Sequence, residues 1–203
     1  LADNTLVVFT SDNGPPWQRL GGTDSAFFHS AGPLRAHKGS AYEGGIREPF
    51  IAYWPGKIPG GRTSDFVGGF QDVLPTLCDL AHVEKPTNID GISITPTLFK
   101  KDNQPAHKYL YWEFSNYDQQ QAVREGKWKI IRRGVDVGGP PYELYDLSTD
   151  IGEKHNIAAD HPHVVARLSK YAVEAHTPSK SFPLLANEKP KGYQPKKGPN
   201  IND

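Results

Sequence analysis

Two oxygen-bearing side chains, Asp12 and Asn13, follow a short stretch rich in β-branched and aromatic residues, Thr5–Phe9. That stretch predicts a buried strand, which the Ser-Asp-Asn-Gly-Pro-Pro sequence after it cannot continue. Open α/β sheets place their ligands at the carboxyl ends of strands, so this position favours a binding site. Carboxylate and amide oxygens are hard ligands that suit Ca²⁺ or Mg²⁺. Taken alone, however, Asp-Asn-Gly is better explained as a plain turn.

A second motif lies further along the chain, from Pro33 to Pro49. It contains the pattern Leu-Arg-x-x-Lys-Gly-x-x-Tyr-Glu-Gly-Gly-Ile-Arg-x-Pro. Together with the preceding Ser-Asp-Asn-Gly, this ordered pattern resembles the formylglycine-dependent sulfatases of the alkaline-phosphatase-like superfamily. The resemblance implies that Asp12 and Asn13 bind the active-site metal, expected to be Ca²⁺, with Mg²⁺ as the alternative. It also implies that Lys38 contacts the sulfate ester as a catalytic and substrate-binding residue.

The residues around Lys38 offer further candidates. His37 is a possible substrate-binding residue and general acid, because imidazole titrates near neutral pH, although a histidine beside a functional residue is usually only a polar neighbour. Glu43 and Arg47 lie four residues apart and would form an ion pair on a helical turn. We therefore expect Glu43 and Arg47 to support the Lys38 loop rather than to take part in catalysis.

No nucleophile for such a reaction is encoded in this chain. In the family the nucleophile is a hydrated formylglycine, made from Cys or Ser in the motif Cys/Ser-x-Pro-x-Arg, and the only cysteine, Cys78, has Leu80 and His82 at the motif positions. Cys78 is instead expected on the apolar face of a helix, as a packed thiol. The family's paired aspartates and Lys-x-His element are also absent. The expected protein is the C-terminal portion of a sulfatase, inactive without its N-terminal portion as partner.

The elements that would position these residues fall into two regions. Residues 1–99 are expected to form the C-terminal part of an alkaline-phosphatase-like mixed sheet, in an α/β fold that belongs to the sulfatase catalytic domain. A second buried strand is predicted at Phe50–Trp54. Asp72 is the expected N-cap of a helix whose apolar residues share one face.

The second region, residues 107–176, contains short strands separated by short turns. This pattern predicts a small antiparallel sheet, with one helix capped by Asp160 and packed across it. Residues 177–203 form a Pro/Lys-rich tail that either wraps the surface or is disordered. The resemblance to sulfatases ends at about His176. The expected strands are residues 109–114, 121–124, 128–132 and 142–147.

Composition excludes several classes of function. The chain has 203 residues, 36% of them hydrophobic, and a formal net charge of zero. It can therefore bury a core, and nothing in its charge indicates a nucleic-acid partner or an anionic membrane. No apolar run reaches the roughly 18 residues of a membrane span. The chain contains no methionine, not even at its start, so we expect it to be part of a longer protein. The resemblance suggests a periplasmic or secreted location.

Three functions are compatible with the sequence. The first is hydrolysis of a sulfate ester, in a sulfated small molecule or a sulfated carbohydrate, by the complete protein. The second is the action of another superfamily member on phosphoesters. The third is a non-catalytic carbohydrate-binding module whose aromatic face would contain Trp112, Phe114 and Tyr117. The long Leu-Arg-x-x-Lys-Gly motif favours the first.

Overall fold

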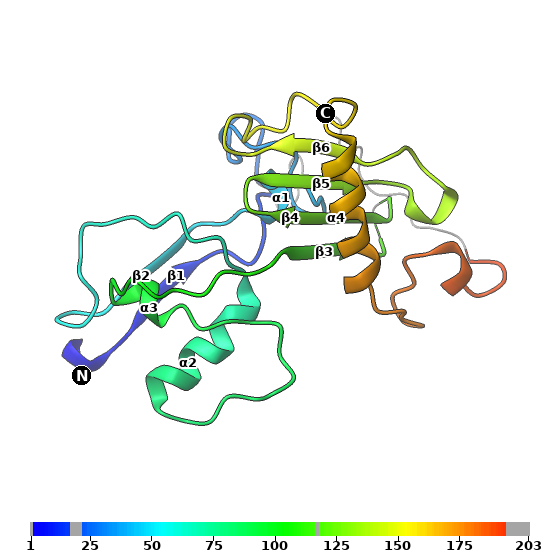
Figure 1. The fold of residues 1–203 in the computed structure, drawn as a ribbon. Helices are drawn as coiled ribbons and strands as arrows, with labels where there is room; N and C mark the ends of the chain where they lie inside the picture. The colour runs from blue at the N-terminus through cyan, green and yellow to red at the C-terminus, as the bar shows by residue number, and fades with distance from the viewer. Residues whose placement is uncertain (1, 17–21, 117, 194–203) are drawn as a thin grey trace. The chain divides into compact units, whose positions relative to one another are not determined.

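The computed structural model describes residues 2–16, 22–116 and 118–193. The chain divides into two compact units (Figure 1). The first unit contains residues 1–11 and 49–110, and the second contains residues 12–48 and 111–203. The candidate site residues Asp12, Asn13, His37 and Lys38 therefore all belong to the second unit.

A two-stranded antiparallel sheet lies in the first unit. Strand β1 (Val7–Thr10) pairs with β2 (Phe50–Tyr53) in a register that places Phe9 opposite Ile51. Both strands were predicted from the sequence, but their predicted burial is wrong: Phe9 is 63% exposed and Ile51 is 58% exposed. The reason is that β1 and β2 form a sheet of two strands only among the described residues, and such a sheet offers little surface to pack against.

The main helix of this unit begins where the sequence predicted, but the predicted capping hydrogen bond is absent. Asp72 stands at the N-cap position of the main helix, yet its side chain makes no capping hydrogen bond to it. The Asp72 carboxylate instead accepts hydrogen bonds from Gly69 N (2.9 Å), Ile92 N (2.8 Å) and His107 Nε2 (2.9 Å). Cys78 is 8% exposed, as expected for a packed thiol. The helices of this unit are η1 (Ala2–Asn4), η3 (Phe70–Asp72), α2 (Val73–Ala81) and α3 (Thr95–Leu98).

The second unit is built on a four-stranded sheet in the order β3-β4-β5-β6. The β4–β5 and β5–β6 pairs are antiparallel, which confirms the predicted antiparallel sheet. Residues Gly126 and Lys127 join β4 to β5 in a tight turn. The strands are β3 (Leu110–Phe114), β4 (Gln120–Glu125), β5 (Trp128–Arg132) and β6 (Glu143–Asp146).

Helix α4 (Pro162–Ala175) lies across this sheet (Figure 1). The predicted cap is wrong, because the N-cap position is His161 rather than Asp160, and no side chain caps the helix. A proline at the first helical position favours the start there, since its fixed φ is already helical. No helix in the described part of the chain is long and apolar enough to cross a membrane. The buried residues of α4 are Val164, Leu168 and Ala172.

The loop that carries the second motif contributes to the core of this unit. Ala41 and Tyr42 are fully buried just before the short helix α1 (Glu43–Ile46). Consequently the Tyr-Glu-Gly-Gly part of the motif folds against the four-stranded sheet. Two further short helices are η4 (Val135–Val137) and η5 (Ala186–Glu188). The buried cluster comprises Ala41, Tyr42, Ala122, Ile131, Tyr145 and Leu147.

Candidate functional site

Two backbone hydrogen bonds bring the two motifs together. The N–H of Gly14 donates to the carbonyl oxygen of Gly45 (3.1 Å), and the N–H of Lys38 donates to that of Pro15 (2.9 Å). A Cβ atom added to Gly14 would lie 1.8 Å from the carbonyl oxygen of Gly44, so only glycine fits there. The glycine of Asp-Asn-Gly therefore does more than allow a turn, because it admits the backbone of the second motif.

The residues expected to bind metal lie next to this contact. Asp12 is exposed and Asn13 is half-buried. Glu48 adds a third oxygen-bearing group nearby: burial, and then the negative charge of Asp12, raise the pKa of Glu48. The Oε1 atom of Glu48 is buried and receives no hydrogen bond from the described residues.

The side-chain oxygens of Asp12, Asn13 and Glu48 are of the type that binds a hard divalent cation, but they are too few to complete its coordination. Ca²⁺ takes about six to eight oxygen ligands. Among the described residues there is no group of three or more His, Cys, Asp or Glu side chains that could hold a metal ion. Asp12 and Asn13 can therefore supply only part of a metal site, and their role remains a prediction.

Lys38 and His37 differ in their environment. The side chain of Lys38 is exposed, so its ammonium group can reach an anion in solution. His37 is 7% exposed, and its Nδ1 lies 3.0 Å from the carbonyl oxygen of Lys38. Because a carbonyl oxygen only accepts, Nδ1 carries the proton in this contact. Burial lowers the pKa of His37, so the imidazole is neutral at pH 7.

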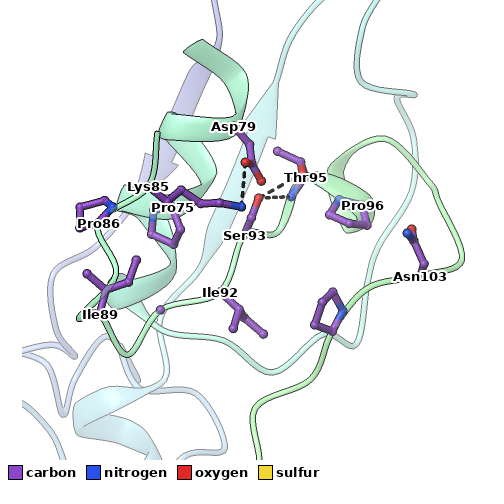
Figure 2. A pocket seen from close by; sticks show the side chains of 12 residues that line it. Pro75, Asp79, Lys85, Pro86, Ile89, Ile92, Ser93, Thr95, Pro96 and Asn103 are labelled. Atoms are coloured by element: carbon purple, nitrogen blue, oxygen red, sulfur yellow. Dashed lines mark hydrogen bonds and ion pairs between the residues drawn. The ribbon is translucent and has the colours of Figure 1, made fainter. Parts of the chain in front are cut away.

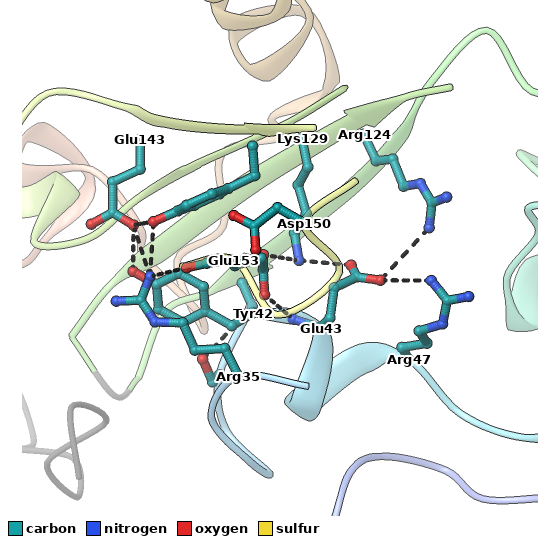
Figure 3. A network of polar contacts seen from close by, with 12 residues as sticks. Arg35, Tyr42, Glu43, Arg47, Arg124, Lys129, Glu143, Asp150 and Glu153 are labelled. Carbon is teal, nitrogen blue, oxygen red and sulfur yellow. Dashed lines mark hydrogen bonds and ion pairs between the residues drawn. The ribbon is translucent and has the colours of Figure 1, made fainter. Parts of the chain in front are cut away.

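A buried network of charged side chains holds the loop that follows Lys38 (Figure 3). Lys129, on β5, is 0% exposed, and its Nζ lies 2.8 Å from Glu43 Oε1 and 2.8 Å from Glu153 Oε1. Glu153 Oε2 accepts the backbone N–H of Glu43 at 2.6 Å. The other carboxylate oxygen of Glu43 faces Arg47 at 3.3 Å and Arg124 at 3.7 Å. Glu43 is thus surrounded by three cations.

The two carboxylates of this network respond differently to it. Burial alone would raise the pKa of Glu43, but the cations, Lys129 foremost, outweigh burial and lower it. Burial raises the pKa of Glu153, and Lys129 offsets this only in part. The predicted Glu43–Arg47 pair is confirmed, whereas sequence reasoning missed Lys129 and Glu153. Lys129 could have been identified from the sequence, because it is a single charged residue within the apolar strand Trp-Lys-Ile-Ile. No such signal marks Glu153.

A second set of contacts links the start of the motif to β6. Arg35 stacks over the ring of Tyr42 at 3.9 Å and donates a hydrogen bond to the hydroxyl of Tyr145 at 2.8 Å. The hydroxyls of Tyr42 and Tyr145 both donate to Glu143 Oε2 at 2.6 Å. The motif's arginine and tyrosine therefore anchor the loop to the sheet, and they leave its lysine to face solvent.

The aromatic face considered for a carbohydrate-binding module has another role in the described part. Trp112 and Phe114 are partly buried and pack against the core cluster of the second unit. Tyr117 lies outside the described residues. Since packing accounts for the two described rings, they do not supply an open stacking surface.

A separate hollow of about 440 Å³ lies within the first unit (Figure 2). Its lining is rich in proline, and its two charged side chains neutralise each other, because Lys85 Nζ lies 2.9 Å from Asp79 Oδ1. Ser93 and Thr95 likewise share a hydrogen bond between their hydroxyls. The hollow therefore offers no unbalanced charge and holds none of the motif residues.

Comparisons with known proteins cover most of the chain. The family model described as N-sulphoglucosamine sulphohydrolase, C-terminal, matches residues 36–176. Arylsulfatase A of Homo sapiens is 35% identical over 182 residues, covering 77% of this chain and 34% of the relative. N-acetylgalactosamine-6-O-sulfatase of Bacteroides thetaiotaomicron is 34% identical over 188 residues, covering 84% of this chain and 36% of the relative.

The fold is also similar to that of solved structures. One of them, described in connection with the metabolism of multiple glycosaminoglycans by Bacteroides thetaiotaomicron, has a TM-score of 0.70 and 31% sequence identity. The match covers 86% of this chain and 39% of that chain. The chain spans about a third of the length of the two curated relatives.

Proposed function

The chain belongs to the sulfatase family, by the match to its C-terminal domain, and on that premise we propose that Asp12, Asn13 and Lys38 form part of a sulfate-ester hydrolase site. The named relatives are sulfuric-ester hydrolases, and the fold has the α/β character, the antiparallel sheet and the packed helix predicted from the sequence. The observation that carries the proposal is the pair of backbone hydrogen bonds between the segment after Asn13 and the segment that contains Lys38.

Lys38 is assigned to the sulfate group. The sulfonyl oxygens carry negative charge, and a fixed cation next to them stabilises the additional charge that develops when the sulfur–oxygen bond breaks. The exposed ammonium of Lys38, on a loop whose base is held by buried ion pairs, suits this task. Neutral His37 would not supply a second positive charge; its ring N–H holds the Lys38 carbonyl oxygen.

Asp12 and Asn13 are assigned to the metal, Ca²⁺ or alternatively Mg²⁺. A divalent cation there would neutralise charge on the sulfate ester. The oxygen donors fit such a cation in type, and the further ligands and the formylglycine nucleophile are expected from another portion of the complete protein. This portion is also the expected partner of the exposed face of β1 and β2, where Phe9 and Ile51 are largely open to solvent.

A sulfated carbohydrate is the proposed class of substrate. One relative is named as an N-acetylgalactosamine-6-O-sulfatase, and one similar structure is described in the context of glycosaminoglycans. A phosphoester-hydrolysing member of the superfamily is the second candidate, but both curated relatives carry sulfatase names.

The experiment is sulfate-ester hydrolysis by the complete protein that carries this chain, with 4-nitrophenyl sulfate as substrate. Lys38→Ala should lower kcat/KM by roughly 10²-fold or more, because a cation aimed at the transferred group is lost. His37→Ala should cost less, and Lys154→Ala, a control at an exposed lysine, should have little effect. The 203-residue chain alone should show no turnover. A His37→Ala effect larger than that of Lys38→Ala would reverse the assigned roles.

A further inference from the structure

A buried glutamine on β4 contacts the turn that carries Lys38. Gln120 is 0% exposed, and its side-chain amide uses both of its ends on this turn. Oε1 accepts the backbone N–H of Ala41 at 2.9 Å, and Nε2 donates to the carbonyl oxygen of Gly39 at 3.1 Å. Rotating the amide by half a turn would oppose donor to donor and acceptor to acceptor, so its orientation is determined.

These bonds restrain Lys38 from its C-terminal side. On the other side, the backbone N–H of Lys38 donates to the carbonyl oxygen of Pro15 at 2.9 Å. Within the turn, Ser40 N donates to the carbonyl oxygen of His37 at 3.1 Å. The peptide group before Lys38 and the two peptide groups that follow Gly39 and Ser40 are therefore held. Three hydrogen bonds from outside the turn, one to Pro15 and two to Gln120, restrain the backbone on both sides of Lys38.

We propose that Gln120 is a positioning residue for Lys38, holding the 37–41 turn at the distance from the sulfate group at which the ammonium is effective. The inference rests on the proposed role of Lys38 and extends the site to a residue on β4. Displacing a catalytic group by about 1 Å can cost about 10²-fold in rate, so one buried amide suffices for a measurable effect.

The neighbouring Gln121 provides a matched control. It is 5% exposed on the same strand, and its amide is also fully engaged, but with other partners. Nε2 of Gln121 donates to the hydroxyl of Tyr111 (2.9 Å) and to the carbonyl oxygen of Ala172 (3.1 Å), and Oε1 accepts from the hydroxyl of Tyr142 (2.7 Å). Gln120→Ala and Gln121→Ala therefore remove the same buried group, and only the first touches the Lys38 turn.

The test is a double-mutant cycle on kcat/KM for 4-nitrophenyl sulfate, in the complete protein that carries this chain. Gln120→Ala should lower kcat/KM by roughly 10- to 100-fold when Lys38 is present. In a Lys38→Ala background it should lower kcat/KM less than about 2-fold, because the group that it positions is gone. Gln121→Ala should have the same small effect in both backgrounds, even where it lowers the melting temperature as much as Gln120→Ala does.

Hydrogen exchange supplies a readout that does not depend on activity. In the 203-residue chain, Gln120→Ala should accelerate exchange of the Ala41 amide by about 10-fold or more, and Gln121→Ala should leave that amide unchanged. If Gln120→Ala does not fold, Gln120→Glu serves in both measurements. This variant keeps the acceptor for Ala41 and places a carboxylate oxygen against the carbonyl oxygen of Gly39.

The outcomes separate the two proposals. An equal loss from Gln120→Ala with and without Lys38, or unchanged Ala41 exchange, would overturn the positioning role. If Lys38→Ala left kcat/KM unchanged, the proposed function would be overturned. The positioning role of Gln120 in catalysis would then be overturned as well.

Discussion

Apolar residues on strands have opposite environments in the two units of the molecule. In the first unit, β1 and β2 expose Phe9 (63%) and Ile51 (58%). In the second unit, Ile130 and Ile131 on β5 are 0% exposed, because α4 covers one face of the sheet and the motif loop with Ala41 and Tyr42 covers the other. An apolar run thus predicts a strand, but burial depends on whether another layer covers it.

Charged side chains are buried in both units, and Asp72 of the first unit is 2% exposed. The second unit buries an ammonium group completely, at Lys129, between the carboxylates of Glu43 and Glu153. Such burial is stable only when partners replace the lost water, as they do here. The second unit therefore depends on buried ion pairs as well as on apolar packing.

Breaking the buried network should produce the largest effect. Lys129→Met should lower the free energy of unfolding by about 3–5 kcal/mol, because it leaves two buried carboxylates without their shared cation. Urea unfolding of the chain measures it. Lys127→Met is the matched control: Lys127 Nζ lies 2.6 Å from Asp146, but its side chain is 50% exposed, so the loss should stay below about 1 kcal/mol. Equal losses in the two variants would show that the network contributes no more than a surface pair.

A pH-dependent contact near the end of α4 should have an intermediate effect. His176 Nδ1 lies 2.7 Å from Glu113 Oε2, and Nε2 lies 2.5 Å from Glu188 Oε1. Ionised carboxylates only accept, so the imidazole must carry both protons to satisfy both contacts. Burial alone would lower the pKa of His176, but the two carboxylates outweigh burial and raise it. A hydroxyl group, that of Tyr111, also bonds to Glu113.

The sign of the effect follows from the raised pKa. The stabilisation is complete below the unfolded pKa of about 6.5 and is lost as the pH rises through the higher folded pKa of His176. We expect His176→Gln to cost about 1.5–3 kcal/mol in urea unfolding at about pH 5.5, and clearly less at about pH 9. His155→Gln, at a side chain that is 79% exposed, should show no such difference. A cost for His176→Gln that did not change with pH would contradict this assignment.

Substitutions in the exposed β1–β2 sheet should have the smallest effect on folding stability, but they should clearly reduce self-association of the isolated chain. Phe9 and Ile51 lie opposite each other, so Phe9→Glu combined with Ile51→Lys replaces an apolar pair by a cross-strand ion pair. The free energy of unfolding should change by less than about 1 kcal/mol, whereas self-association of the isolated chain, measured by sedimentation, should decrease. Val173→Lys, at a single exposed valine on α4, is the control. If only Val173→Lys reduced association, the surface through which the chain self-associates would lie in the second unit.

The sequence by itself determined the local features of this protein. Strand positions, the apolar face of α4 and the Glu43–Arg47 pair follow from periods and spacings that span only a few residues. The ordered motif around Asp12, Asn13 and Lys38 indicated the family, which the comparisons then showed.

Only the tertiary structure decided burial and long-range pairing. Gln120 meets Ala41 across 79 residues of sequence, and Lys129 meets Glu43 across 86. No periodicity records such contacts, because they depend on which sheet the motif loop packs against. The sequence placed Asp72 correctly at the N-cap position of α2, but not its hydrogen bonds: the carboxylate bonds to Ile92 and His107, partners supplied by distant parts of the chain, and not to the helix that follows it.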